Sequence, residues 1–262
     1  MRPRPDHPST RPDRLRRKPR RTPRLCPAVV MLARAPREGR VKTRLASALG
    51  RKQALALHEA FLLDTLVWLR PLARAGWRVR LEWSEPFRPR GELRKVLRGI
   101  PCGTQPAGGL GTRIESALRR ALDAGATCAL VIGSDSPHIG AEPLRRTRTL
   151  LRCSDVVLGP ALDGGYYLVG VRRVRRRWFR GIRWGTARVL RQTLSRLRAD
   201  SARTHLLERA QDLDTPANLR ELQKRLERSP ALGRRLRFTK RALGEKAQKG
   251  ALSRARRNSA RR

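Results

Sequence analysis

Apolar and polar positions alternate along the chain in a way that predicts a repeated succession of strands and helices. Short apolar runs typical of buried strands lie at 28–32, 128–132, 155–158 and 166–171. Residues 77–83 alternate apolar and charged side chains, as a half-exposed strand does. Amphipathic stretches that predict helices lie at 45–75, with Gly50 as a candidate break, and at 114–122, 142–151, 186–197 and 216–226. Thr215 and Pro216 suit the N-cap and first position of the last helix.

Strands that alternate with helices over most of the chain predict an α/β fold with one Rossmann-like domain. We expect a mostly parallel sheet with helices on both faces, spanning residues 26–233. In such sheets ligands bind beyond the carboxyl ends of the strands. The segments that follow the strands are therefore the candidate site: 34–44, 134–135, 160–165 and 211–214.

The two ends of the chain are basic tails that we expect to be disordered. The whole chain has 62 Lys and Arg against 21 Asp and Glu, a formal net charge of +41. Residues 1–25 hold ten basic residues and two acids, and residues 234–262 hold twelve basic residues and Glu245 alone. Such segments bury too little apolar surface to offset the entropy of ordering them. The tails can bind polyanions non-specifically, but the Arg runs lack the aromatic residues that stack on bases.

The sequence contains no feature that predicts a membrane or a secreted protein. No run of about 18 apolar residues is present, so no transmembrane helix is expected. The basic N-terminus lacks the apolar segment of a secretory signal. Four widely spaced cysteines without a CxxC pair suit reduced thiols and argue against a zinc site. We therefore expect a cytoplasmic protein.

The loop after the first strand is a candidate phosphate-binding segment. It carries Arg34, Lys42 and Arg44 among other basic residues, and Gly39 allows a ligand close to the backbone. A loop that leads from a strand into a helix also offers free backbone N–H groups to an anion. The GxxxxGK[ST] spacing is absent, so this is no Walker A loop. The alternative is that a very basic chain places several cations in one loop by composition alone.

A glycine-rich segment at 108–113 is a second, weaker candidate. Gly111 could pack against a nucleotide and Arg113 could contact its phosphates, but an ordinary turn before a helix has the same composition.

Two aspartates at predicted strand ends are candidate metal ligands. Asp135 follows the most apolar strand, and Asp214 lies in the 212–216 segment before the last helix. Carboxylates there can hold a hard divalent cation, Mg²⁺ or Mn²⁺, beside a diphosphate. In the alternative interpretations, Asp135 caps a helix and Asp214 pairs with an arginine.

The Asp163-Gly-Gly segment is the last candidate, followed by the chain's two tyrosines. Asp163 either faces the site as a general base or belongs to a tight turn. Tyr166 and Tyr167 are expected to point to opposite faces of an extended segment. His138 is the one histidine expected near the site. The GxSxG and GxGxxG motifs are absent, which argues against a serine hydrolase and a nicotinamide enzyme.

Several segments together resemble one protein family: LARAPREGRVKTRLASALG, GGLGTRI, VIGSDSP, VVLGPALDGGYYLVGV, FRGIRWGTARVL and DLDTPANL. They are similar to the GT-A-type glycosyltransferase-like proteins associated with radical-SAM or selenium-related genes. That family is related to the nucleotide-diphospho-sugar transferases, including molybdenum-cofactor and phospholactate guanylyltransferases. The resemblance covers about residues 28–226.

The resemblance implies a GT-A domain with a divalent metal and donor phosphates near the KTRL segment. Carried over by position, Arg34, Lys42 and Arg44 would bind phosphate, Asp135 would bind the metal, and Asp214 would be a second ligand. The chain departs from the family at Gly109 and Thr112, where acidic residues are usual, and at Ala217-Asn218, where Glu-Asp is usual.

The expected function is that of a metal-dependent glycosyltransferase with a nucleotide-sugar donor and a small-molecule acceptor. Lys42 and Arg44 would offset the charge of the leaving diphosphate, and Asp163 would be the base. One alternative is transfer of a nucleotidyl group from a nucleoside triphosphate to a phosphorylated acceptor. Another is an inactive transferase fold that binds polyanions through its tails. The oligomeric state stays open.

Overall fold

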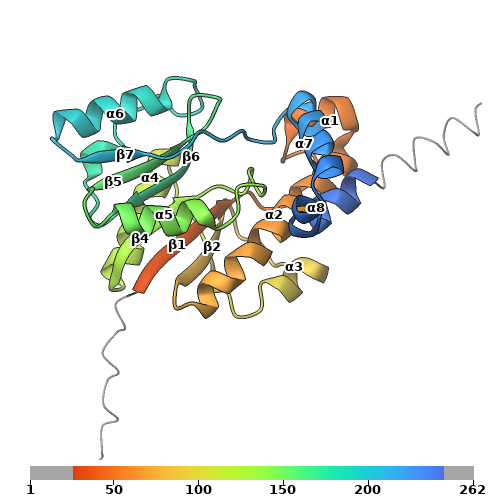
Figure 1. Ribbon diagram of the computed structural model, residues 1–262, viewed down its shortest axis with the longest axis horizontal. Coiled ribbons are helices and arrows are strands. Elements are labelled where there is room, and N and C mark those ends of the chain that lie inside the picture. Colours follow the sequence, from red (N-terminus) through yellow and green to blue (C-terminus); the bar gives the residue numbers. More distant parts are fainter. Residues whose placement is uncertain (1–25, 245–262) are drawn as a thin grey trace, which may run out of the picture.

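The computed structural model describes residues 26–244, which form one seven-stranded sheet with helices on both faces (Figure 1). Its strands are β1 Cys26–Ala33, β2 Arg78–Trp83, β3 Cys102–Thr104, β4 Ala126–Ile132, β5 Val156–Pro160, β6 Tyr166–Val171 and β7 Thr204–Leu206. The order across the sheet is β3-β2-β1-β4-β6-β5-β7, and β6 runs antiparallel to both of its neighbours while the other pairs are parallel. The predicted α/β class and mostly parallel sheet are confirmed. The expectations for 1–25 and 245–262 concern residues outside the described part of the chain.

The helices include all those expected from the apolar periodicity. They are α1 Thr43–Leu49, α2 Arg51–Arg74, α3 Gly91–Val96, α4 Leu110–Asp123, α5 Glu142–Leu150, α6 Val189–Ala199, α7 Pro216–Arg228 and α8 Pro230–Arg235, with a 3-10 turn η1 at Arg176–Trp178. Gly50, with φ +83°, breaks the first helical stretch into α1 and α2 as predicted. Thr215 caps α7 in a reciprocal pair with Asn218. None of these helices is long and apolar enough to cross a membrane.

Short and polar elements escaped the sequence interpretation. The strands β3 and β7 have only three residues each, and α3 and α8 have six. Elements of that length offer too few positions for a period of 2 or 3.6 to emerge. The two strands become regular because neighbouring strands provide their hydrogen-bond partners, and the two helices because their few apolar residues pack on the domain.

The apolar core lies on both faces of the sheet because successive residues of a strand point to opposite sides. In β1, Met31 packs into the cluster beneath α2, α3 and α5, while Val30 packs into the cluster beneath α4 and α6. A third cluster joins α1 and α2 to α7 and α8, which lie side by side in Figure 1.

The strand β2 is more buried than its alternating pattern predicts. Glu82 is 1% exposed and lies on a position that the pattern assigns to solvent. Arg80 Nε at 3.2 Å and Arg120 Nη2 at 2.6 Å contact its carboxylate. This carboxylate is buried because arginines from β2 itself and from α4 supply the charge and hydrogen bonds that water would otherwise provide.

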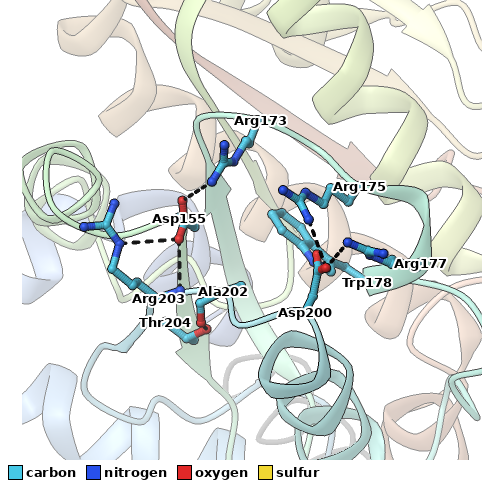
Figure 2. A network of polar contacts seen from close by, with 9 residues as sticks. All are labelled: Asp155, Arg173, Arg175, Arg177, Trp178, Asp200, Ala202, Arg203 and Thr204. Carbon is cyan, nitrogen blue, oxygen red and sulfur yellow. Dashed lines mark hydrogen bonds and ion pairs between the residues drawn. The ribbon is translucent and has the colours of Figure 1, made fainter.

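Two more aspartates form ion pairs with several arginines near the β5–β7 edge of the sheet (Figure 2). Asp155 accepts hydrogen bonds from Arg203 N at 2.9 Å and from Arg173 Nη2 at 3.0 Å. The backbone hydrogen bond from Arg203 and the charges of both arginines lower the pKa of Asp155. Asp200 accepts from Trp178 Nε1 at 2.6 Å and also pairs with Arg175 and Arg177. In a very basic domain, these few acids are placed where chain segments meet.

The domain extends past residue 233. The sequence predicted that the domain would end there and that a disordered tail would begin at residue 234. Leu236, Ala242 and Leu243 are buried in the third cluster. Asp64 of α2 is fully buried and accepts hydrogen bonds from Phe238 N at 3.2 Å, Thr239 N at 2.8 Å and Thr239 Oγ1 at 2.6 Å. Residues 234–244 therefore dock on α2, and their basic composition concealed the few apolar side chains that do so.

We predict that Asp64→Ala will lower the free energy of unfolding by about 3 kcal/mol, because it leaves buried N–H groups at 238 and 239 without an acceptor. Urea unfolding followed by circular dichroism measures this. Asp64→Asn is the matched control, since it keeps one acceptor oxygen and should cost less. An Asp64→Ala protein as stable as the wild type would show that residues 237–244 are not held by this contact.

Candidate active site

A cavity of about 1040 Å³ opens at the carboxyl edge of the sheet. The ends of β1 and β4 and the start of the antiparallel β6 form its floor, and the segments after β1, β2 and β4 and before β6 contribute to its walls. Seven of the residues singled out from the sequence line it: Arg34, Lys42, Arg44, Arg113, Asp135, Asp163 and Asp214. Gly39 and Gly111 are not among the lining residues. The location at strand ends is the one expected for a parallel sheet.

The Lys42 side chain lies between the two predicted metal ligands. Its Nζ is 2.6 Å from Asp135 Oδ1 and 2.6 Å from Asp214 Oδ1, and it donates to Leu213 O at 3.2 Å. The Lys42 side chain is 3% exposed, and its Nζ lies 5.1 Å from the centre of the Phe61 ring. In this structure Lys42 therefore contacts carboxylates and does not project into the cavity as a free phosphate ligand.

The backbone at Lys42 adopts an unusual conformation that directs this side chain inward. Its φ of 47° and ψ of 45° lie in the left-handed region, which costs a non-glycine residue about 1 kcal/mol or more. Lys42 occupies the N-cap position of α1. Such strain persists where other contacts outweigh it, and here the two ion pairs do so.

These ion pairs shift the pKa values of Lys42 and Asp135. Burial by itself would lower the pKa of Lys42, but the charges of Asp135 and Asp214 outweigh it, so that the pKa is raised. Burial would likewise raise the pKa of Asp135, but the Lys42 charge and hydrogen bond hold it below its usual value. The ammonium and the Asp135 carboxylate are consequently both charged at neutral pH.

A third aspartate belongs to the same cluster. Asp212 accepts a hydrogen bond from the Ser136 hydroxyl, and Leu213 N donates to Asp135 O at 3.1 Å. Burial, with smaller contributions from the neighbouring aspartates, raises the pKa of Asp212 to about 6. These contacts fasten the 212–214 segment to the loop after β4 and place three carboxylates at one end of the cavity.

The basic loop after β1 is held by an acid that the sequence analysis did not consider. Glu85 pairs with Arg37 Nε and lies 3.6 Å from Arg40 Nη1. Arg34 and Arg44 are exposed at the cavity. Two of the loop's cations are thus partly neutralised, and Arg34 and Arg44 are the ones most available to an anion.

The glycine-rich segment contributes packing as well as a cation. A Cβ atom at Gly111 would lie 2.6 Å from Trp184 Nε1 and 2.7 Å from Phe179 O, so glycine is needed there for α4 to approach the 179–184 segment. Glycine at position 111 is therefore explained by helix packing and not by the predicted contact with a nucleotide. Arg113 lines the cavity and donates to Gln105 Oε1 at 3.3 Å.

Gln105 is a cavity residue that sequence reasoning missed. Its Nε2 donates to Ala33 O at 3.2 Å and to Glu82 O at 2.8 Å, so its amide is fixed between β1 and β2. An isolated glutamine beyond a three-residue strand has no sequence signal that could have indicated this position.

The opposite wall carries Asp163 and the aromatic residues. Asp163 Oδ1 accepts from Gly165 N at 2.9 Å, which is the turn contact that we considered, and its side chain also lines the cavity. The tyrosines point to opposite faces as predicted. Tyr166 packs edge-on against Trp184 with ring centres 6.0 Å apart, and the Tyr167 hydroxyl donates to Glu208 O at 3.2 Å.

The histidine at the cavity is His58 and not His138. His58 of α2 is 2% exposed, and its Nε2 lies 3.1 Å from Arg34 O. Burial lowers its pKa, which favours the neutral ring. His138 lies outside the cavity lining, and its carbonyl accepts from Arg235. The expectation for His138 was wrong because proximity in sequence to Asp135 does not fix the direction of a loop.

The carboxylate oxygens of Asp135 and Asp214 can supply some, but not all, of the ligands of one hard cation. Within residues 26–244, no group of three or more His, Cys, Asp or Glu side chains forms a complete metal site. Asp135 and Asp214 nevertheless direct one oxygen each to a common point, and water and substrate oxygens can complete the shell of Mg²⁺ or Mn²⁺.

Known proteins resemble this chain in sequence and in fold. Residues 67–186 match the family described as "Uncharacterized protein conserved in bacteria (DUF2064)". No curated protein matches the sequence. A crystal structure from Desulfovibrio desulfuricans G20, described as a "putative nucleotide-diphospho-sugar transferase", is 27% identical, with a TM-score of 0.70; the match covers 84% of this chain and 97% of that one.

Two further solved structures share the fold at low identity. A 4-diphosphocytidyl-2C-methyl-D-erythritol synthase is 10% identical over 78% of this chain and 100% of that one, with a TM-score of 0.52. A cytidylyltransferase from Leptospira borgpetersenii serovar Hardjo-bovis (strain JB197) is 12% identical over 78% and 88%, with a TM-score of 0.50. The Desulfovibrio match confirms the predicted resemblance to nucleotide-diphospho-sugar transferases and the predicted transferase class, and the two further structures confirm the fold.

We predict that Gly111→Ala will destabilise the fold by about 1–3 kcal/mol, because its methyl group overlaps Trp184 and the Phe179 carbonyl. Gly109→Ala is the control, since a Cβ there meets no atom within 4 Å. Thermal unfolding of both variants measures the difference. Equal melting temperatures for the two variants would contradict the packing role of Gly111.

We predict that His138 makes the fold sensitive to mild acid. Burial beside Arg225 and Arg235 lowers its pKa from 6.5 to about 4. Between pH 6.5 and pH 4 the unfolded chain therefore binds a proton that the folded chain rejects, and stability falls as the pH falls. From this group alone, the free energy of unfolding should drop by about 2 kcal/mol between pH 7 and pH 5.

Urea unfolding at the two pH values tests this prediction. His138→Gln should lose less stability than the wild type on acidification, whereas His205→Gln, a change at a partly exposed histidine of β7, should behave like the wild type. Identical acid losses for wild type and His138→Gln would refute the assignment.

Proposed function

We propose that this chain is a metal-dependent glycosyltransferase that uses a nucleoside diphosphate sugar and a small hydroxyl-bearing acceptor. The observation that carries the proposal is the convergence of Asp135 Oδ1 and Asp214 Oδ1 on one point at the edge of the cavity, which the Lys42 Nζ occupies at 2.6 Å from each. Two carboxylates at the strand ends of such a sheet suit a divalent cation beside a diphosphate. The likeness to the Desulfovibrio protein supports this choice of donor class.

Two separate segments of the chain would supply the ligands of the metal site. Asp135 comes from the end of β4, and Asp214 from the segment that leads into α7. Mg²⁺ or Mn²⁺ bound there would neutralise charge on the donor diphosphate and on the leaving nucleoside diphosphate. The protein's task is to hold the two carboxylates in place, which the backbone contact between Leu213 and Asp135 does.

The donor side of the cavity is basic. The arginines that line it come from the loop after β1, from the first turn of α1 and from the start of α4: Arg34, Arg40, Arg44 and Arg113. Guanidinium groups there can contact the donor phosphates and offset the charge that develops as the bond to the sugar breaks. Arg44 is the best placed, because it is exposed and follows Lys42 by two residues.

The acceptor side is acidic and aromatic, which favours a hydroxyl acceptor over a phosphorylated one. Asp163 lines this wall together with Tyr166 and Trp184, Asp212 lines the cavity beside Asp135 and Asp214, and none of the described arginines of the cavity comes from either place. Carboxylates accept hydrogen bonds from hydroxyl groups and repel phosphates. Asp163 or Asp212 can take the acceptor proton during attack on the sugar. We therefore prefer glycosyl transfer to nucleotidyl transfer onto a phosphate.

We predict that a nucleoside diphosphate sugar will raise the melting temperature by about 3 °C or more when Mn²⁺ or Mg²⁺ is present, because ligands that bind only the folded state stabilise it. Thermal unfolding of the full chain with a panel of nucleotide sugars and nucleoside triphosphates, each with and without metal, measures this. Asp135→Asn should abolish the metal-dependent increment. Asp123→Asn, at the exposed end of α4, should retain it.

Each result of the panel has a stated consequence. A metal-dependent increment for one nucleotide sugar, followed by release of its nucleoside diphosphate with an acceptor, supports glycosyl transfer. An increment for a triphosphate alone would replace it with nucleotidyl transfer. A folded protein that responds to no nucleotide would refute an active transferase.

A further inference from the structure

The point at which the two carboxylates of the proposed metal site converge is filled by the protein's own cation. The Lys42 ammonium lies 2.6 Å from Asp135 Oδ1, 2.6 Å from Asp214 Oδ1 and 3.2 Å from Leu213 O. All three of its hydrogen-bonding directions are thereby used. With Asp135 and Asp214 ionised, the triad has a net charge of −1.

This arrangement is a built site and not a chance contact of a surface lysine. The Lys42 side chain is 3% exposed, whereas the side chains of Asp135 and Asp214 are 46% and 41% exposed. The Phe61 ring lies on one side of the ammonium at 5.1 Å. The backbone of Lys42 takes up a left-handed conformation at the start of α1, so the chain accepts local strain to reach this position.

An ammonium and a divalent cation cannot occupy this point together. Magnesium binds carboxylate oxygens at about 2.0–2.1 Å, closer than the Lys42 nitrogen lies to them. A metal ion on the same two oxygens would overlap the ammonium and repel its charge. Binding of the metal therefore requires that Lys42 leave the site.

We propose that Lys42 is an exchangeable internal cation, which occupies the metal position in the free protein and is released when a divalent cation binds there. The inference rests on the proposed function for the identity of that cation and of its donor. Lysine suits the task because its ammonium is a compact point charge on a flexible four-carbon stem. Lys42 and Arg44 both line the cavity, so the released ammonium would reach its basic side and could contact the donor diphosphate there.

The exchange has a consequence for binding order. Without a donor, the metal must displace Lys42 into a loop that is already rich in arginines, which disfavours metal binding. A diphosphate supplies the displaced ammonium with a new anionic partner. Metal and donor should therefore increase each other's affinity by the same factor.

We predict that Lys42→Met will bind Mn²⁺ at least 10-fold more tightly than the wild type in the absence of nucleotide, because it removes the competing cation and leaves both carboxylates in place. Titration of the full chain with Mn²⁺, followed by electron paramagnetic resonance of the free ion, measures the affinity. Arg44→Met is the matched control: it removes one positive charge from the first turn of α1, two residues from Lys42, and leaves Asp135 and Asp214 unchanged, so it should change the affinity less than 3-fold.

Two further variants complete the titration. Lys42→Gly, which suits the left-handed backbone, should match Lys42→Met and shows that the gain does not depend on the new side chain. Lys42→Met combined with Asp135→Asn should lose the gain. Equal affinities in wild type and Lys42→Met, or an equal gain in Arg44→Met, would overturn the exchange.

A second measurement uses the wild-type chain and does not depend on any variant folding. Acetylation of Lys42 by acetic anhydride, followed by mass spectrometry, should be slow in the free protein because the amine is buried and paired. Saturating Mn²⁺ without nucleotide should accelerate it at least 5-fold, while the acetylation rate of Lys52, exposed in the first turn of α2, should stay the same. An unchanged Lys42 rate at saturating Mn²⁺ would overturn the proposal.

The failure of this inference can be told from failure of the proposed function. If Lys42→Met gains no affinity for Mn²⁺ but the wild type still shows metal-dependent stabilisation by a nucleotide sugar, the exchange is refuted and the transferase stands. If Lys42→Met gains the affinity and no nucleotide stabilises the wild type, the cation exchange holds and the donor assignment falls.

Discussion

The contact between the Lys42 ammonium and the carboxylates of Asp135 and Asp214 is the interaction on which the candidate site depends. It joins the loop after β1, the end of β4 and the segment before α7, which are far apart in the sequence. Burial of the Lys42 ammonium carries a desolvation cost, which its ion pairs offset only if its remaining hydrogen-bonding capacity is also satisfied. The Leu213 carbonyl satisfies it here, and this contact and the backbone bond between Leu213 and Asp135 fix the position of α7 relative to the sheet.

The rest of the domain follows a similar rule for a chain with so few acids. Glu82 joins β2 to α4, and Asp155 and Asp200 hold the arginines around the β5–β7 edge. Asp64 anchors the segment after α8. Each of these carboxylates lies where two elements meet, so that the acids of the described chain contribute to packing out of proportion to their number. The cavity is the place where several acids gather, and this concentration sets the chemistry that it can perform.

The cavity has two sides of opposite charge, and this division connects the fold to the proposed reaction. Four arginines line the cavity, and Asp163 and Asp212 line it as well; in the proposed reaction the arginines would contact the donor and one of these two carboxylates would contact the acceptor. The paired carboxylates of Asp135 and Asp214 lie between them. A leaving diphosphate and an attacking hydroxyl need opposite electrostatic surroundings, and the order of the strands supplies both at one edge of the sheet.

The amino-acid sequence by itself determined five of the seven strands, the longer helices, the position of Asp135 after a strand and that of Asp214 before a helix, because apolar periodicity and capping residues act over a few neighbouring positions. Only the tertiary structure decided that Lys42 pairs with those aspartates, that His58 and Gln105 face the cavity, and that Gly111 accommodates Trp184. It also decided that residues 234–244 dock on α2. These contacts join residues that are distant in the chain, and their geometry depends on the direction of each side chain after the sheet and its helices have packed.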